Sequence, residues 1–120
     1  MKIKLNEKDS KIHKQNETYT LLDNTSLKNL VVSKTILHPG KNTTGHNHVG
    51  QEEVYHFISG EGYIRLGIKP CSTSSLSDKK YNVRSGDIVL IPDGVFHKVF
   101  NTSEIEDLVF VCVFDGSRNH

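Results

Sequence analysis

The chain is organised around the stretch Gly40-Lys-Asn-Thr-Thr-Gly-His46-Asn-His48-Val-Gly-Gln-Glu-Glu53-Val-Tyr-His-Phe-Ile-Ser-Gly60. One residue separates its two histidines, and side chains alternate in direction along an extended segment, so His46 and His48 project to the same side. Glu53 follows shortly after and begins a run of aromatic and β-branched residues. Two imidazoles with a nearby carboxylate are suitable ligands for a divalent metal ion.

A second stretch supplies a third imidazole: Gly86-Asp-Ile-Val-Leu-Ile-Pro92-Asp-Gly94-Val-Phe-His97-Lys-Val-Phe-Asn101. If its last part is a strand, then His97, Val99 and Asn101 share one face. If Glu53 begins a strand and faces inward, then Tyr55 and Phe57 face inward too, and Val54, His56 and Ile58 face the opposite side.

Short apolar runs alternate with turn residues along the whole chain, and no stretch has a helical period. The predicted strands are rich in Val, Ile, Phe and Tyr. They are Tyr19–Leu22, Leu30–Leu37, Glu53–Ser59, Tyr63–Ile68, Tyr81–Val83, Ile88–Ile91, His97–Phe100 and Leu108–Phe114. About eight short strands at this spacing predict an all-β fold, either a β-sandwich or a small barrel.

The domain organisation follows from the same pattern. Residues 1–17 form a polar, lysine-rich segment that is expected either to fray or to form, through Ile3 and Leu5, an edge strand at a dimer interface. Residues 18–116 form a single barrel, and residues 117–120 are a C-terminal tail. Within the barrel, Lys69–Lys80 is serine-rich and is predicted to be a solvated loop.

Composition limits the class of protein. The chain has 120 residues, enough for one domain, and its 15 basic and 14 acidic residues give no reason to expect nucleic acid or a membrane as partner. The first residues contain no apolar core of a secretory signal. Cys71 and Cys112 are too few for a disulfide scaffold, so a reduced cytoplasmic protein is expected, although a bridge between them stays open.

Both stretches resemble the two signature motifs of the cupin family, Gly-x5-His-x-His-x4-Glu-x6-Gly and Gly-x5-Pro-x-Gly-x2-His-x3-Asn, with every specified position filled. The resemblance covers residues 40–60 and 86–101. It implies a cupin double-stranded β-helix, also called a jelly-roll barrel. It also implies that the metal ligands are His46, His48, Glu53 and His97. A metal-free barrel that keeps the pattern for packing is the alternative.

A set of three imidazoles and one carboxylate suits divalent Mn, Fe, Zn, Ni or Co, and the sequence does not choose among them. Four protein ligands leave two positions of an octahedron open. A substrate with two adjacent oxygens is expected to fill these positions.

The run Glu53-Val-Tyr55-His-Phe-Ile58-Ser-Gly60-Glu-Gly62 is similar to a segment of cupin-type sugar-phosphate isomerases, with Ile58 at a leucine position. The likeness implies a small cupin of the mannose-6-phosphate-isomerase-like kind, which isomerises a sugar or sugar phosphate with the metal as Lewis acid. Tyr55 is then the candidate catalytic base. The chain has no obvious pair of arginines to clamp a phosphate, which counts against a phosphosugar.

Two other functions stay open. With Fe(II), the same site supports a dioxygenase, or with another metal a lyase, acting on a small organic acid. A non-catalytic barrel that binds a sugar or other small molecule is the third possibility. In each case the partner is a small molecule, and a homodimer is expected because the edges of a jelly roll need covering.

Residues outside the ligand set receive plainer interpretations. Arg65 and Lys98 are candidates for binding an anion at the barrel mouth, although solvated strand charges are the simpler interpretation. Asn101 is expected to satisfy a turn or a strand end rather than to take part in chemistry. The remaining histidines, His13, His38 and His120, are expected to be solvated.

Overall fold

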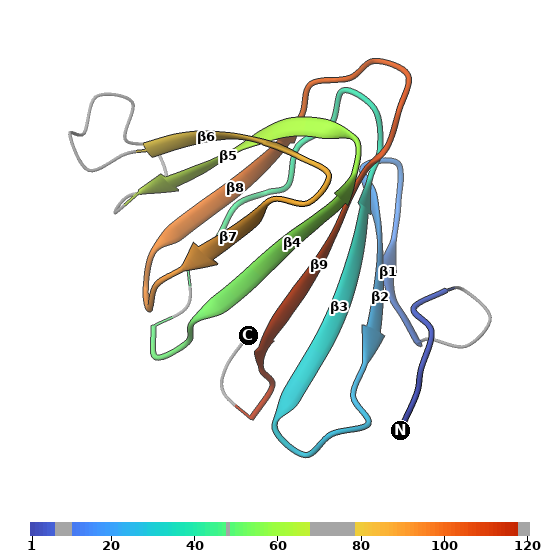
Figure 1. Cartoon of the computed structure of the whole chain (residues 1–120), viewed down its shortest axis with the longest axis vertical. Coiled ribbons are helices and arrows are strands. Elements are labelled where there is room, and N and C mark those ends of the chain that lie inside the picture. The colour runs from blue at the N-terminus through green and yellow to red at the C-terminus, as the bar shows by residue number, and fades with distance from the viewer. Residues whose placement is uncertain (7–10, 48, 68–78, 118–120) are drawn as a thin grey trace.

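The computed structural model describes residues 1–6, 11–47, 49–67 and 79–117, and the regular elements in these ranges are all strands (Figure 1). They are β1 (Lys11–Gln15), β2 (Tyr19–Asn24), β3 (Leu30–Leu37), β4 (Glu53–Ser59), β5 (Glu61–Gly67), β6 (Lys79–Arg84), β7 (Ile88–Ile91), β8 (Phe96–Asn101) and β9 (Leu108–Asp115). His48, Cys71 and His120 lie outside the described residues. Within those residues there is no helix of the length and apolarity needed to cross a membrane.

The strands form two antiparallel sheets that face each other (Figure 1). The larger sheet has the order β1-β2-β3-β9-β4-β7, and the smaller has the order β6-β5-β8. The segment from Lys41 to His46 runs beside the free edge of β8 and pairs with it through isolated bridges. The arrangement is the all-β jelly roll that the sequence predicts.

Every second side chain of a strand points into the space between the sheets and helps to fill it. In β9, Leu108, Phe110, Cys112 and Phe114 are buried while the intervening residues are partly exposed. In β4, Glu53, Tyr55 and Phe57 are buried and the residues between them are exposed, as predicted. The aromatic rings of Phe57 and Phe110 are both fully buried and lie 5.1 Å apart, so they form the centre of the core.

Most predicted strands are present, and three of them, Leu30–Leu37, Glu53–Ser59 and Ile88–Ile91, have the predicted bounds. The predicted C-terminal boundary of the loop 69–80 is wrong, because Lys79 and Lys80 belong to β6 and pair with β5. The rest of that loop falls outside the described residues.

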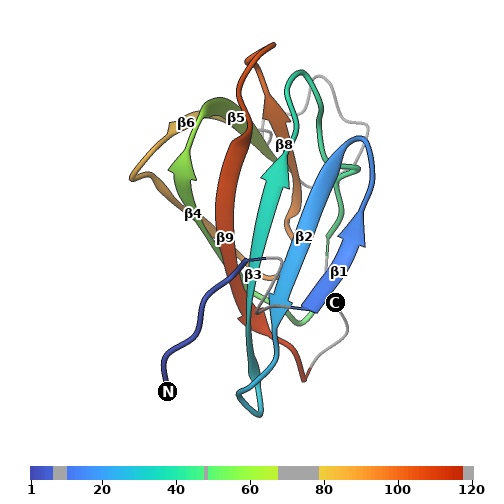
Figure 2. The same ribbon diagram turned by 90° about the vertical axis from the view of Figure 1, so that its right-hand side faces the viewer.

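The edge strand of the N-terminal segment is β1 rather than the stretch around Ile3 and Leu5, which has no strand structure. The first residues instead cross the outer face of the large sheet, as Figure 2 shows. Lys34 of β3 donates a hydrogen bond of 3.4 Å from Nζ to the carbonyl oxygen of Leu5 there.

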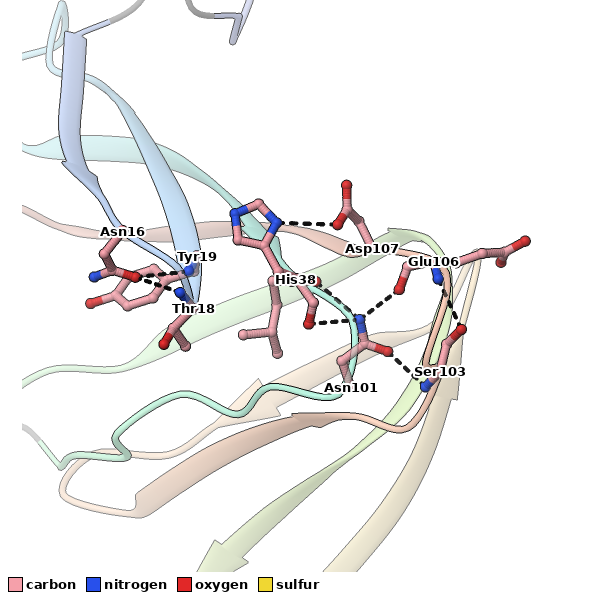
Figure 3. Close-up of polar contacts among 9 residues, drawn as sticks. Asn16, Thr18, Tyr19, His38, Asn101, Ser103, Glu106 and Asp107 are labelled. Carbon is pink, nitrogen blue, oxygen red and sulfur yellow. Dashed lines mark hydrogen bonds and ion pairs between the residues drawn. The ribbon is translucent and has the colours of Figure 1, made fainter.

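Asn101 joins the end of β8 to the segments around it (Figure 3). Its Nδ2 donates to the carbonyl oxygens of Leu37, His38 and Glu106 at 3.0, 3.2 and 2.8 Å. Its Oδ1 accepts a hydrogen bond of 2.9 Å from the amide of Ser103. The side chain is buried, and both its nitrogen and its oxygen form hydrogen bonds with backbone groups. The prediction that Asn101 satisfies a strand end is therefore confirmed.

Candidate metal centre

Three of the four predicted ligands come together between the two sheets. The ligand atoms of His46, Glu53 and His97 all lie within 4.8 Å of one another. Oε2 of Glu53 is 3.9 Å from Nε2 of His97, and the two imidazole rings are 4.4 Å apart, edge to face. The fourth predicted ligand, His48, lies outside the described residues, so its ligation stays a prediction.

Backbone pairing places two of these ligands side by side. The amide of His46 donates to the carbonyl of His97 at 3.1 Å, and the amide of His97 donates back at 2.9 Å. Glu53 comes from the other sheet, where it is the first residue of β4. The cluster therefore bridges the two sheets. Its two buried members, Glu53 and His97, are 4% and 3% exposed, whereas His46 is exposed.

The segment between His46 and Glu53 is held at several points. The amide of Gly50 donates to Oδ1 of Asp93 at 2.6 Å. The side chain of Gln51 is buried and donates from Nε2 to the carbonyl of Asp115 at 2.7 Å. Sequence reasoning missed Asp93 and Gln51 as supports, because their partners are distant in the chain.

Gly45 allows the chain to approach β8 closely enough for His46 to pair with His97. Its φ is +83°, a conformation that residues with a side chain rarely adopt. A Cβ atom at this position would collide with the ring of Phe96 and crowd Lys98. The sequence signal for this requirement is the glycine directly before the histidine pair.

The orientation of His97 suits metal binding. Its Nδ1 lies 3.0 Å from the carbonyl oxygen of Val95, which can only accept, so Nδ1 carries the proton. This tautomer leaves the lone pair on Nε2, the nitrogen that faces Glu53. Metal-ligating histidines usually donate their second nitrogen in this way.

Burial changes the ionisation of the groups around Glu53. Burial raises the pKa of Glu53 from 4.5 to about 7, and a hydrogen bond from the hydroxyl of Tyr55 opposes the change. Burial also raises the pKa of the Tyr55 phenol well above its usual value, and the nearby Cys112 and Glu53 act in the same direction. The phenol therefore keeps its proton at neutral pH.

The donor set fits a divalent transition metal. A buried carboxylate is costly to ionise without a nearby positive charge, and a metal ion beside Glu53 would supply that charge. Two imidazoles and a carboxylate match the ligand preferences of Mn, Fe, Co, Ni and Zn. The structure thus supports a metal site of the predicted chemistry, formed by His46, Glu53 and His97 among the described residues.

A cavity of about 120 Å³ adjoins this cluster. All three described ligands line it, together with apolar and sulfur-containing side chains of the large sheet, namely Leu21, Phe110, Cys112 and Phe114. Hydroxyl groups complete the wall, from Tyr19, Ser33, Thr35, Thr43, Thr44 and Tyr55. The cavity is the space in which a molecule bound beside the metal would lie.

Other residues considered from the sequence lie elsewhere. Arg65 and Lys98 are direct cross-strand partners on the face of the small sheet opposite His97, and neither lines the cavity. An anion site formed by them at the barrel mouth stays a prediction. His56 is exposed on the outer face of β4, as predicted. His38 is only partly exposed, and its Nδ1 contacts Oδ1 of Asp107 at 3.2 Å (Figure 3).

Comparison with known proteins agrees with this architecture. The Cupin_2 family model, which describes a cupin domain, matches residues 33–114, so the chain belongs to the cupin family. The uncharacterized protein MJ1618 of Methanocaldococcus jannaschii is 25% identical over 83 residues, which are 69% of this chain and 58% of that protein.

Solved structures show the same fold. The oxalate decarboxylase of Lactobacillus farciminis, in a formate complex, superposes with a TM-score of 0.73 at 24% identity over 88% of this chain. The oxalate decarboxylase of Bacillus subtilis, which has Mn(II) centres, gives a TM-score of 0.74 at 22% identity, again over 88% of this chain. The chain spans only 30% and 28% of these two proteins, so the likeness concerns the fold and not their activity.

Proposed function

We propose that this protein is a metal-dependent isomerase of small hydroxycarbonyl compounds. The observation that carries the proposal is the cluster of His46, Glu53 and His97 at the wall of a cavity between the sheets. A divalent metal held there would polarise a substrate carbonyl as a Lewis acid. His48 is the fourth ligand in this proposal.

The reaction needs no second substrate. In an aldose–ketose exchange, a proton leaves C2 and is returned to C1, while the hydroxyl proton moves from O2 to O1. No oxidant or reductant is consumed. Among the described residues that line the cavity, Glu53 is the one carboxylate able to accept the C2 proton. A carboxylate has two oxygens, so one can serve a metal while the other accepts a proton.

Tyr55 has a different role in this proposal from the base suggested by the sequence. Because burial keeps its phenol protonated, the hydroxyl is suited to donate a hydrogen bond. It lies at the cavity wall and already donates to Glu53. We propose that it also donates to the substrate oxygen on which negative charge develops, which is a favourable interaction in a water-poor site.

The experiment is isomerisation in D₂O, followed by NMR, with protein loaded separately with Mn, Fe, Co, Ni or Zn under anaerobic conditions. We expect deuterium at C1 or C2 of the substrate with at least one metal. Tyr55→Phe should lower kcat on the order of 100-fold while the metal content is unchanged. Failure of every metal to promote exchange would contradict the isomerase.

The alternative is an Fe(II)-dependent dioxygenase or a lyase acting on a small organic acid, and the small volume of the cavity favours a substrate of that size. Oxygen consumption with iron alone would support the dioxygenase. A ligand that is bound but recovered unchanged after long incubation would support a non-catalytic binding protein.

A further inference from the structure

The walls of the cavity restrict the size of the molecule that binds beside the metal. Its volume is about 120 Å³, whereas a protein cavity of about 150 Å³ holds one benzene molecule. The space within the walls therefore accepts about six non-hydrogen atoms, as in a three-carbon sugar. A hexose has about twice that number, and a hexose phosphate more.

The charge of the cavity restricts the ligand further. No lysine or arginine is among the described residues that line it. A divalent ion with one carboxylate and neutral imidazoles has a net charge of about +1, and the half-buried Asp23 behind Ser33 adds a negative charge. Among the described residues of the cavity wall, a phosphate dianion would therefore find no lysine or arginine to pair with, which favours an uncharged ligand.

Two hydroxyl groups on different walls have fixed and opposite hydrogen-bonding roles. Ser33 donates its proton to Oδ1 of Asp23 at 2.6 Å, so towards the cavity its oxygen acts as an acceptor. Oγ1 of Thr43 accepts from the amide of Val99 at 3.0 Å, so its own proton remains to be donated. A hydroxyl group of the ligand is both donor and acceptor, and is thus suited to satisfy both.

We propose that the site selects unphosphorylated three-carbon hydroxycarbonyl compounds, such as glyceraldehyde and dihydroxyacetone. Two adjacent oxygens would lie towards the metal, and the remaining hydroxyl would lie between Ser33 and Thr43. This inference rests on the proposed function for the orientation of the ligand. The binding itself does not require that the ligand be converted.

Binding is measured separately from turnover, by calorimetric titration of dihydroxyacetone into protein loaded with Zn, and by the visible spectrum of the Co(II) form. We expect saturable binding, with a change in the Co(II) bands. Ser33→Ala and Thr43→Val should each weaken binding about fivefold, the effect of losing one hydrogen bond. Thr43→Ser, which keeps the hydroxyl, should bind as the wild type does.

Several results would overturn the proposal. Binding of dihydroxyacetone phosphate as tight as that of dihydroxyacetone would contradict the charge argument. Equal binding of a hexose would contradict the size argument. Unchanged affinity in both Ser33→Ala and Thr43→Val would show that these two hydroxyl groups do not bind the ligand. If dihydroxyacetone binds as described but is not isomerised, the ligand class stands and the isomerase fails.

Discussion

Single residues connect the sheets of this barrel, and Asn101 does so from the end of β8. Its side-chain amide donates hydrogen bonds to three backbone carbonyl oxygens and accepts one from a backbone amide. Asn101→Asp would put a carboxylate beside those carbonyl oxygens, and we expect a loss of about 2–4 kcal/mol in the free energy of unfolding. Urea denaturation of the variant measures this loss.

The matched control is Asn82→Asp, because Asn82 is exposed on β6. That change should alter the free energy of unfolding by less than about 0.5 kcal/mol. An Asn101→Asp variant as stable as the control would show that the buried amide is not required.

Glu53 makes the stability of the metal-free protein depend on pH. Its pKa is about 7 in the folded chain and 4.5 when unfolded, so the folded state binds the proton more tightly. The resulting stabilisation is fully present below pH 4.5 and is lost as the pH rises through 7. From the size of the shift it amounts to about 3 kcal/mol at most.

Chelator-treated wild type and Glu53→Gln are compared by urea denaturation between pH 5 and pH 8. The wild type should lose stability relative to the variant as the pH rises. Metal affinity of the wild type should increase over the same range, because the ligand must be deprotonated. A stability difference that does not change with pH would contradict the assignment.

At the scale of elements, the segment beside β8 depends on Gly45. We expect Gly45→Ala to weaken metal binding at least about tenfold, because the strained backbone and the contact with Phe96 would displace His46. Gly86→Ala is the control, since Gly86 also has a positive φ but has open space around it. It should cost stability without changing metal affinity, as measured by competition with a chromophoric chelator. Equal metal affinity in both variants would refute this role.

The strands show what sequence can and cannot predict in this fold. β4 and β7 were predicted with correct bounds because their side chains and turn residues follow clear patterns. β1 was missed because its sequence, Lys-Ile-His-Lys-Gln, has one apolar residue and the strand is held by backbone pairing with β2. Edge strands commonly carry such polar residues.

Sequence likewise predicts only part of the candidate metal site. The resemblance of two sequence stretches to the cupin motifs was enough to predict that His46, Glu53 and His97 gather. Alternation adds only the face of the strand on which each side chain lies. The volume of the cavity and the pairing of Ser33 with Asp23 depend on contacts between distant strands. No local pattern carries that information.

At the scale of the whole molecule, the outer face of the large sheet exposes four apolar side chains on β4 and β7, namely Val54, Ile58, Ile88 and Leu90. Val54 and Leu90 are direct cross-strand neighbours, and Ile88 is paired with His56, whose imidazole lies on the same face. Exposed apolar patches mark interfaces, and two copies of one patch can pair about a two-fold axis. We expect a homodimer formed through this face.

Light scattering at micromolar concentration should give the mass of a dimer for the wild type and that of a monomer for Leu90→Asp. Ile105→Asp is the control, because Ile105 is equally apolar and exposed but lies in the loop before β9. It should remain dimeric. A monomeric wild type would reject the prediction.

We expect a divalent metal to bind where the two sheets meet, beside His46, Glu53 and His97. Elemental analysis of purified protein, after metal loading and removal of the excess, tests it most directly. We predict about one ion per chain in the wild type and in His56→Ala, whose imidazole is on the outer face of β4. The double variant His48→Ala with His97→Ala should hold almost none. Full metal content in the folded double variant would contradict the account.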